Sequence, residues 1–269
     1  MSPRRGFDAV DRTTDPDNLV TYLDAVRRTG FFEEVKRRTL TAMELRQGDT
    51  AVDVGCGTGE DVSAMASLIS AKGRAIGVDI SATMIAKALQ RARDARSPAM
   101  FVQGDVFALP FADASVDAIR AERVLQHTRN ANAAFQEMVR VANHGARIVI
   151  WEGDLDLFVV DAPDYEASRV VQRAVCDQFL NGAIGHRLYG MFVHAGLTDV
   201  RSLPLLRPVM DLSLIESAFD LSMCLALVVS RGLLEPERAD RWMESLRTAS
   251  RNSHFFSVIG GFITSGRKD

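Results

Sequence analysis

The sequence has few cysteines and no long hydrophobic run. Its three cysteines, Cys56, Cys176 and Cys224, lie far apart and share no metal-ligand spacing, so we expect neither a disulfide framework nor a zinc site. The longest apolar stretch, residues 223–229, is too short to cross a bilayer. The N-terminal residues MSPRRGFDAV lack the apolar core of a signal peptide. These features predict a cytoplasmic protein.

The sequence also lacks an excess of positive charge. The formal net charge of the 269-residue chain is −3, whereas nucleic-acid-binding domains usually carry a basic surplus. There are no internal repeats and no low-complexity tracts. A hydrophobic share of 47% supplies enough apolar residues for a large core. We therefore expect a globular protein that acts on a small molecule, without a nucleic-acid or membrane partner.

Short apolar segments alternate with longer amphipathic ones between residues 50 and 154. The predicted strands cover 50–55, 74–80, 99–105, 115–126 and 146–154, and the helices between them cover 59–70, 81–96 and 131–142. This alternation predicts an α/β fold with a mostly parallel sheet covered on both faces. Right-handed crossovers make the sheet doubly wound. Two later strands, 198–203 and 255–267, bring it to seven strands.

Helical periodicity surrounds this core. Residues 17–46 predict two helices separated at Gly30, and further helices are expected at 163–180, 185–195 and over much of 211–249. We therefore divide the chain into an N-terminal helical cap (1–47), a core (48–204 and 253–269) and a helical lid or substrate insertion (205–252). The insertion is rich in apolar side chains. They could form plain core, line an apolar acceptor pocket or make a homodimer surface.

Three glycines close together mark the end of the first predicted strand. Gly55, Gly57 and Gly59 lie in VDVGCGTG, where missing Cβ atoms let a ligand approach bare backbone at a helix N-terminus. The dinucleotide fingerprint has a different spacing, and the lysine of a P-loop is absent. Glu60 and Asp61 would repel a pyrophosphate at this helix end. The turn thus favours a ligand without phosphates that carries positive charge, and the alternative is a tight turn without a ligand.

Two acids end the next two predicted strands. Asp79 follows GV and Asp105 follows QG, and the carboxyl ends of adjacent parallel strands line one crevice. A carboxylate at Asp79 could accept both hydroxyls of a ribose. Asp105 could accept a hydrogen bond from an exocyclic amine such as adenine N6, while the Val106 N–H donates to a ring nitrogen.

With these residues in place, the chain resembles the class I S-adenosylmethionine-dependent methyltransferases. The matching segments are VDVGCGTG, GVDIS, FVQGDVFALPFADASVDAI, RVLQHTRNANAAFQEMVRVANHGARIVI and RLYGMFVHAGLTDV, in the family's order, over roughly residues 48–203. The chain is most similar to the small-molecule type found in ubiquinone and menaquinone biosynthesis and among bacterial natural-product enzymes. The resemblance implies a Rossmann-like methyltransferase fold and S-adenosyl-L-methionine as cofactor.

The resemblance also implies roles for individual residues. The three glycines would face the methionine and ribose, and Asp53 would contact the amino group through backbone or water. Asp79 would bind the ribose. The residues implied around adenine and in the rest of the cofactor site are Ile80, Met84, Gly104, Asp105, Val106 and Glu122. One departure is Asn143-His144-Gly145, which stands where the family usually has Pro-Gly-Gly before the fifth strand.

Candidates for catalysis follow the fourth predicted strand, in AERVLQHT. Histidine titrates near neutrality, so His127 could serve as general base, although it could equally pack the turn. Glu122 and Arg123 are candidates for substrate contact, with Arg123 alternatively paired to Glu122 or Glu152. On the N-terminal segment, Tyr22 could reach the sulfonium or the acceptor, or simply pack.

Other polar residues near predicted strand ends have weaker signals. Glu152 and Asp154 could orient an acceptor, His186 and Arg187 could help form its pocket, and His194 is expected to be structural. No Gly-x-Ser-x-Gly elbow supports a hydrolase. We therefore predict methyl transfer to a small, partly apolar acceptor. The alternatives are a cofactor-binding regulator or cyclase without methyl transfer, and a protein or RNA methyltransferase.

Overall fold

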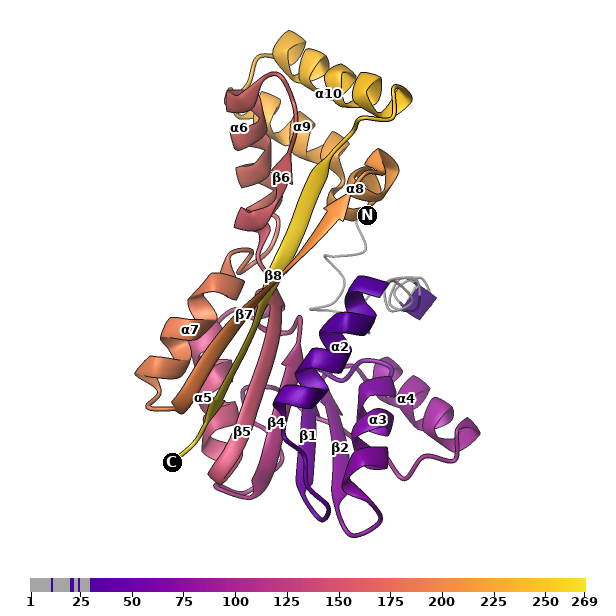
Figure 1. Cartoon of the computed structure of the whole chain (residues 1–269), viewed down its shortest axis with the longest axis vertical. Helices are drawn as coiled ribbons and strands as arrows, with labels where there is room; N and C mark the ends of the chain where they lie inside the picture. Colours follow the sequence, from indigo (N-terminus) through magenta and orange to yellow (C-terminus); the bar gives the residue numbers. More distant parts are fainter. Residues whose placement is uncertain (1–10, 12–19, 22–23, 25–29) are drawn as a thin grey trace.

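The computed structural model describes residues 11, 20, 21, 24 and 30–269 (Figure 1). Its first half is the predicted alternation of strands and helices. In chain order these are α2 (Gly30–Ala42), β1 (Thr50–Val54), α3 (Glu60–Ile69), β2 (Arg74–Asp79), α4 (Ala82–Asp94), β3 (Met100–Gln103), β4 (Val116–Glu122), α5 (Ala131–Val141) and β5 (Ala142–Gly153). Ser81 caps α4, because its Oγ accepts a hydrogen bond from Met84 N–H at 3.1 Å.

The sheet has the order β3-β2-β1-β4-β5-β8-β6, and β7 pairs with β8. Strands β1 to β5 pair in parallel, and β8 (Ser257–Arg267) runs antiparallel to β5. The doubly wound, mostly parallel fold is thus confirmed. The described sheet has eight strands rather than seven, because β6 (Val159–Val160) adds a two-residue strand beside β8.

Strand β7 (Thr198–Val209) is longer than the predicted 198–203. It pairs with β8 from Thr198 to Val209, so the first residues assigned to the helical insertion belong to a strand. The local sequence hides this continuation because Pro204 and Pro208 interrupt it. Proline cannot donate to a ladder and is tolerated at a sheet edge, and β7 pairs with β8 alone.

Both faces of the parallel sheet are buried. On one face α2 and α3 pack against Ala51, Ala118 and Val149, and on the other α5 and α7 (Ile184–His194) pack against Val52 and Ile148. Figure 1 shows α2 lying across β1, β4 and β5. Trp151 is in the core, with the centre of its ring 5.4 Å from that of Phe32 in α2.

A second apolar core lies around the far ends of β7 and β8 (Figure 1). It joins α6 (Tyr165–Cys176), α8 (Leu212–Phe219), α9 (Leu221–Ser230) and α10 (Pro236–Arg251). Trp242 of α10 donates from Nε1 to Ser168 Oγ of α6 at 2.9 Å. The apolar residues of the insertion therefore pack with α6, which ends at Cys176, well before the insertion begins at residue 205.

No single described helix is both long and apolar enough to span a bilayer. Helices α8 and α9 reach that length and apolarity only together, and they are bent by 59° relative to each other.

Candidate functional site

A cavity of about 480 Å³ opens at the carboxyl ends of β1, β2, β3 and β4. It collects most of the residues that the sequence singled out for cofactor binding and catalysis. Those lining it are Asp53, Gly55, Gly57, Asp79, Ile80, Met84, Gly104, Asp105, Val106, Glu122, Arg123 and His127. This volume lies within the range of small-molecule sites. Residues from three strand ends and the β4 turn thus share one cavity, as parallel-sheet geometry requires.

The glycine turn requires its glycines for two different reasons. All three have positive φ, at +70° for Gly55, +51° for Gly57 and +85° for Gly59. A Cβ on Gly55 would lie 2.4 Å from Val124 Cγ2, and one on Gly59 would lie 2.5 Å from the ring of Phe101. Gly55 and Gly57 line the cavity, but Gly59 does not. The structure gives Gly59 a packing role against β3 and α4, which differs from the predicted contact with the cofactor.

Asp79 and Asp105 line the same cavity, and each also fixes the backbone beside it. The Asp79 carboxylate accepts hydrogen bonds from Gly57 N–H and from Ser81 N–H, both at 2.9 Å. Burial raises the pKa of Asp79, and these two hydrogen bonds oppose the rise. Asp105 Oδ1 accepts from Phe107 N–H at 2.9 Å. Both carboxyl groups keep lone pairs for a ligand, since a carboxylate can accept about four hydrogen bonds.

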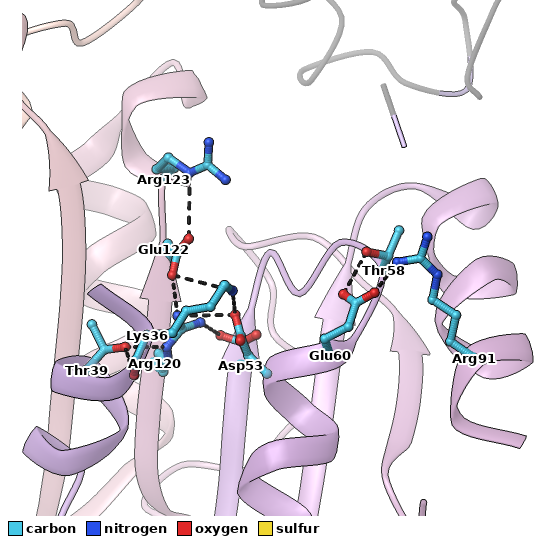
Figure 2. Close-up of polar contacts among 10 residues, drawn as sticks. Lys36, Thr39, Asp53, Thr58, Glu60, Arg91, Arg120, Glu122 and Arg123 are labelled. Atoms are coloured by element: carbon cyan, nitrogen blue, oxygen red, sulfur yellow. Dashed lines mark hydrogen bonds and ion pairs between the residues drawn. The ribbon is translucent and has the colours of Figure 1, made fainter. Parts of the chain in front are cut away.

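A buried network of charged side chains lines the cavity on the side of α2 and α3 (Figure 2). Asp53 and Arg120 are register partners on β1 and β4, and Arg120 is only 1% exposed. Its guanidinium donates to Asp53 Oδ1 at 2.9 Å, to Thr39 Oγ1 at 3.0 Å and to Glu122. Alternation along β4 puts residues 120 and 122 on one face. Glu122 therefore reaches the Arg120 guanidinium from the same strand, while Asp53 reaches it from the adjacent strand β1.

Two residues of α2 and α3 complete the network. Lys36 pairs with Asp61, and its Nζ lies 3.9 Å from Glu122 Oε2. Burial disfavours the charge on Arg120, but the carboxylates of Asp61, Asp53 and Glu122 raise its pKa. Burial in turn raises the pKa of Asp53, and Arg120 opposes that rise. Arg120 was not predicted as a site residue, although an arginine inside the largely apolar strand VDAIRAE indicates a buried charge that needs acidic partners.

The turn after β4 carries Arg123 and His127, and Glu152 fixes its shape. Glu152 Oε1 accepts from Val124 N–H at 2.8 Å and from Leu125 N–H at 2.6 Å. Glu152 is fully buried, and this burial raises its pKa to about 8. The short 3-10 helix Leu125–His127 follows, and His127 Nε2 lies 2.9 Å from the side-chain amide nitrogen of Gln126. Glu152 therefore supports the backbone of the turn and does not line the cavity.

Several predicted acceptor residues lie elsewhere. Asp154 Oδ2 accepts from His186 N–H at 2.6 Å and lies 2.7 Å from its Nδ1, at the start of α7. Neither residue lines the cavity, nor does Arg187. The fold brings Asp154, Asp156 and His186 to within 4.8 Å of one another, a group that no sequence spacing suggested. His194 is exposed on α7 and its Nδ1 lies 2.6 Å from Gly190 O, in agreement with a structural role.

The N-terminal segment contributes to the cavity as well. Tyr22 lies outside the described residues, but Asp24 lines the cavity. Arg91 of α4 donates to both oxygens of Asp24, at 3.0 and 2.9 Å, and also to Glu60 (Figure 2 shows the Arg91–Glu60 contact). Residue 11 caps the same helix: Asp11 accepts from Ser81 Oγ at 2.6 Å and from Ala82 N–H at 2.9 Å.

The profile of a methyltransferase-domain family matches residues 45–196. This stretch runs from just before β1 to the end of α7 and contains every described element that builds the cavity except α2 and Asp24.

The chain belongs to the class I S-adenosylmethionine-dependent methyltransferases.

Relatives and solved structures agree with this family. The chain is 36% identical to an uncharacterized 37.1 kDa protein in transposon TN4556 of Streptomyces fradiae, over 91% of this chain and 69% of that protein. It is 41% identical to a demethylmenaquinone methyltransferase of Roseiflexus sp. (strain RS-1) and 34% identical to a 2-phytyl-1,4-naphtoquinone methyltransferase of Thermosynechococcus vestitus. These two matches cover 38% and 43% of this chain, and 42% and 51% of the relatives.

The fold is also that of solved structures. YcgJ of Bacillus subtilis superposes with a TM-score of 0.64 at 19% identity, over 88% of this chain and 98% of that one. A Haemonchus contortus phosphoethanolamine N-methyltransferase 2, solved with S-adenosyl-L-methionine, superposes with a TM-score of 0.60 at 16% identity, over 97% of this chain and 59% of that one. The predicted family and Rossmann-like fold are therefore confirmed.

Proposed function

We propose that this methyltransferase transfers a methyl group from S-adenosylmethionine to a small, partly apolar, quinone-like acceptor. One observation carries the proposal. The glycine turn, Asp79 and Asp105 come from three neighbouring strand ends and line a single cavity. The acceptor class rests on the two quinone-type methyltransferases above, of which this chain matches about half the length.

The donors and acceptors of the cavity fit a nucleoside that carries positive charge. Asp79 would hold the ribose hydroxyls, and Asp105 with Val106 N–H would hold the adenine edge, with Ile80 and Met84 against its faces. Gly55 and Gly57 bring backbone close to the methionine part. Among the described residues, seven acids line the cavity, against four lysine and arginine side chains; the acids are Asp24, Asp53, Glu60, Asp61, Asp79, Asp105 and Glu122. This excess of carboxylates suits a sulfonium cation.

When bound, S-adenosylmethionine supplies an already activated methyl group. The chain then needs to orient the acceptor for an in-line displacement and to exclude water. His127 lines the cavity on the turn after β4 and is our candidate for the group that takes a proton from the acceptor. A positioned base of this kind contributes roughly 10²–10⁴-fold. We further propose that the N-terminal region up to residue 47 caps the site, since Asp24, Phe32 and Lys36 line it.

For the helical insertion we retain two of the three predicted roles, plain core and a homodimer surface. No residue of 205–252 is among the described residues that line the cavity, and the last of these is Leu180. We propose that the insertion stabilises the helical region through the second apolar core and offers a surface for a homodimer. Acceptor contacts come instead from the β4 turn and from α2.

Two measurements test the proposed function. Isothermal titration calorimetry should show S-adenosylhomocysteine binding in the micromolar range or tighter. With a reduced naphthoquinone as acceptor, S-adenosylhomocysteine and methylated product should form in equal amounts. Binding without turnover on a broad set of acceptors would favour a cofactor-binding regulator or cyclase, and absence of binding would remove the proposal.

A further inference from the structure

Arg123 is a cavity residue whose guanidinium is only loosely paired within the protein. The other buried cations of the site are matched, because Lys36 and Arg120 contact Asp53, Asp61 and Glu122. Arg123 is paired more loosely: its Nε lies 3.7 Å from Glu122 Oε1, beyond hydrogen-bond distance, and its charge also acts on the buried Glu152. That Nε is buried and has no hydrogen-bond acceptor. A buried N–H without an acceptor is rare in native proteins and calls for an explanation.

The backbone directs this side chain toward the cavity at some energetic cost. Arg123 has φ of +55°, in the left-handed region that residues with a Cβ seldom adopt. Its N–H donates to Trp151 O at 2.9 Å, which ties the strained residue to β5. Strand alternation would send residue 123 to the face opposite Glu122. The left-handed turn instead leaves both side chains on the side of α2. Strain of this kind concentrates at functional sites.

Phe32 holds the guanidinium in place without using its N–H groups. The Arg123 Cζ lies 4.7 Å from the centre of the Phe32 ring, a cation–π distance. A stacked guanidinium keeps its edge free, and its N–H groups form a fork that matches a carboxylate or another anionic oxygen. In Figure 2 the Arg123 guanidinium lies beyond Glu122 and points away from the Arg120 network.

The position of Arg123 assigns it to the acceptor side of the cavity. The groups fitted to ribose and adenine lie at the ends of β2 and β3, whereas Arg123 shares the β4 turn with His127. Arg129 follows on the same stretch, lines the same cavity and has no ion pair among the described residues. Glu122 ends β4 just before this turn, and Arg123 and Arg129 give the turn itself two positive charges.

We propose that Arg123 binds an anionic oxygen of the acceptor, either a carboxylate or an ionised aromatic hydroxyl. This inference rests on the proposed function and names the class of acceptor for it. Both kinds of acceptor are flat aromatic molecules with one anionic oxygen. The aromatic part is proposed because Phe32 lies beside the guanidinium and is apolar. An adjacent guanidinium also favours the ionised form of an acceptor hydroxyl.

The test measures binding of inert acceptor analogues to the full-length protein saturated with S-adenosylhomocysteine, by calorimetry. The matched pair is 2-naphthoate and its neutral isostere 2-naphthamide, and a nitronaphthol that is ionised in the buffer separates the hydroxyl arm from the carboxylate arm. We expect at least one of the two anions to bind roughly 10- to 100-fold more tightly than the amide, the range for hydrogen bonds to a charged group. Whichever anion shows the preference identifies the acceptor's oxygen.

The variants assign that preference to one residue. In Arg123→Gln the preference should fall to about threefold or less, and Arg123→Lys should restore part of it because the charge returns without the fork. Arg231→Gln, at an exposed arginine that does not line the cavity, should keep the wild-type preference. S-adenosylhomocysteine affinity should change little in all three variants.

Three results would overturn the inference. The wild-type protein could bind the anions and the amide equally, a result that needs no variant. The preference could survive in Arg123→Gln. Alternatively, Arg123→Gln could lose S-adenosylhomocysteine as strongly as it loses the anions, which would assign Arg123 to the carboxylate of the cofactor. Failure of the wild-type protein to bind S-adenosylhomocysteine at all would instead remove the proposed function.

Discussion

The Asp79 carboxylate accepts a hydrogen bond from the N–H of Gly57 at 2.9 Å. This bond joins the end of β2 to the glycine turn that follows β1. One side chain therefore shapes the turn and also lines the cavity in which the turn presents its backbone. Loss of Asp79 should affect both functions.

Replacing Asp79 by Ala should weaken S-adenosylhomocysteine binding by about 1–3 kcal/mol, the scale of losing hydrogen bonds to a charged acceptor. Calorimetry measures the affinity. Asp79→Asn, which keeps an oxygen for Gly57 N–H, should lose less. Asp94→Ala is a matched control, because residue 94 is exposed at the end of α4. Unchanged affinity in Asp79→Ala would show that the ribose site lies elsewhere.

Replacing Arg120 by Met should strongly destabilise the fold. It leaves Asp53 buried without its partner, and breaking a buried ion pair by removing one charge typically costs about 3–5 kcal/mol. Urea unfolding measures the loss. The double variant Arg120→Met/Asp53→Asn should recover part of the stability, because the orphaned charge is gone. Arg201→Gln removes a mostly exposed pair with Asp199 and should leave the urea midpoint almost unchanged. If Arg120→Met leaves the urea midpoint as little changed as Arg201→Gln does, the Arg120 network does not stabilise the fold.

Replacing His127 by Ala should slow turnover more than it weakens cofactor binding, if His127 takes the acceptor's proton. The expected loss is roughly 10²–10⁴-fold in kcat, with S-adenosylhomocysteine affinity nearly unchanged. His194→Ala provides a control at an exposed histidine outside the cavity. Full activity of His127→Ala would return this residue to a packing role beside Phe179, whose ring centre is 6.0 Å away.

Glu152 should make stability fall as pH rises. Its folded pKa is about 8, against an ordinary value of 4.5. Between these values the folded state keeps a proton that the unfolded state releases, so the free energy of unfolding decreases with rising pH, and above about pH 8 the effect stops. Glu152→Gln removes this titration while keeping an oxygen for the N–H groups of Val124 and Leu125.

Urea unfolding at about pH 6 and about pH 9 measures this difference, which linkage relates directly to the pKa shift. The wild-type protein should lose more stability than Glu152→Gln between the two conditions. Glu44→Gln, at a half-exposed carboxyl whose pKa is lowered by Arg147, is a control that should retain the wild-type pH dependence. Equal slopes in the wild-type protein and Glu152→Gln would show that Glu152 is already ionised in the folded protein.

The sheet of β1 to β5 and the place of the site follow from local sequence patterns. Alternating apolar segments specify strands and helices locally, and parallel strands necessarily present their carboxyl ends at one edge. The glycine turn, Asp79 and Asp105 could therefore be assigned to one crevice without any knowledge of contacts. The cap of α4 by Ser81 is local as well, because it joins residues only three positions apart.

Which charged side chains contact one another depends on the packing of the whole chain. Arg120 contacts Asp53 and Thr39, which lie 67 and 81 residues away in the chain, and no local pattern encodes such distant pairs. The raised pKa of Glu152 comes from complete burial, which depends on how β5 packs under the β4 turn. The unpaired Nε–H of Arg123 likewise appears only in the packed structure, where Glu122 lies near it but does not accept a hydrogen bond from it. Burial and long-range pairing are properties of the packed chain, and they decide the electrostatics of this site.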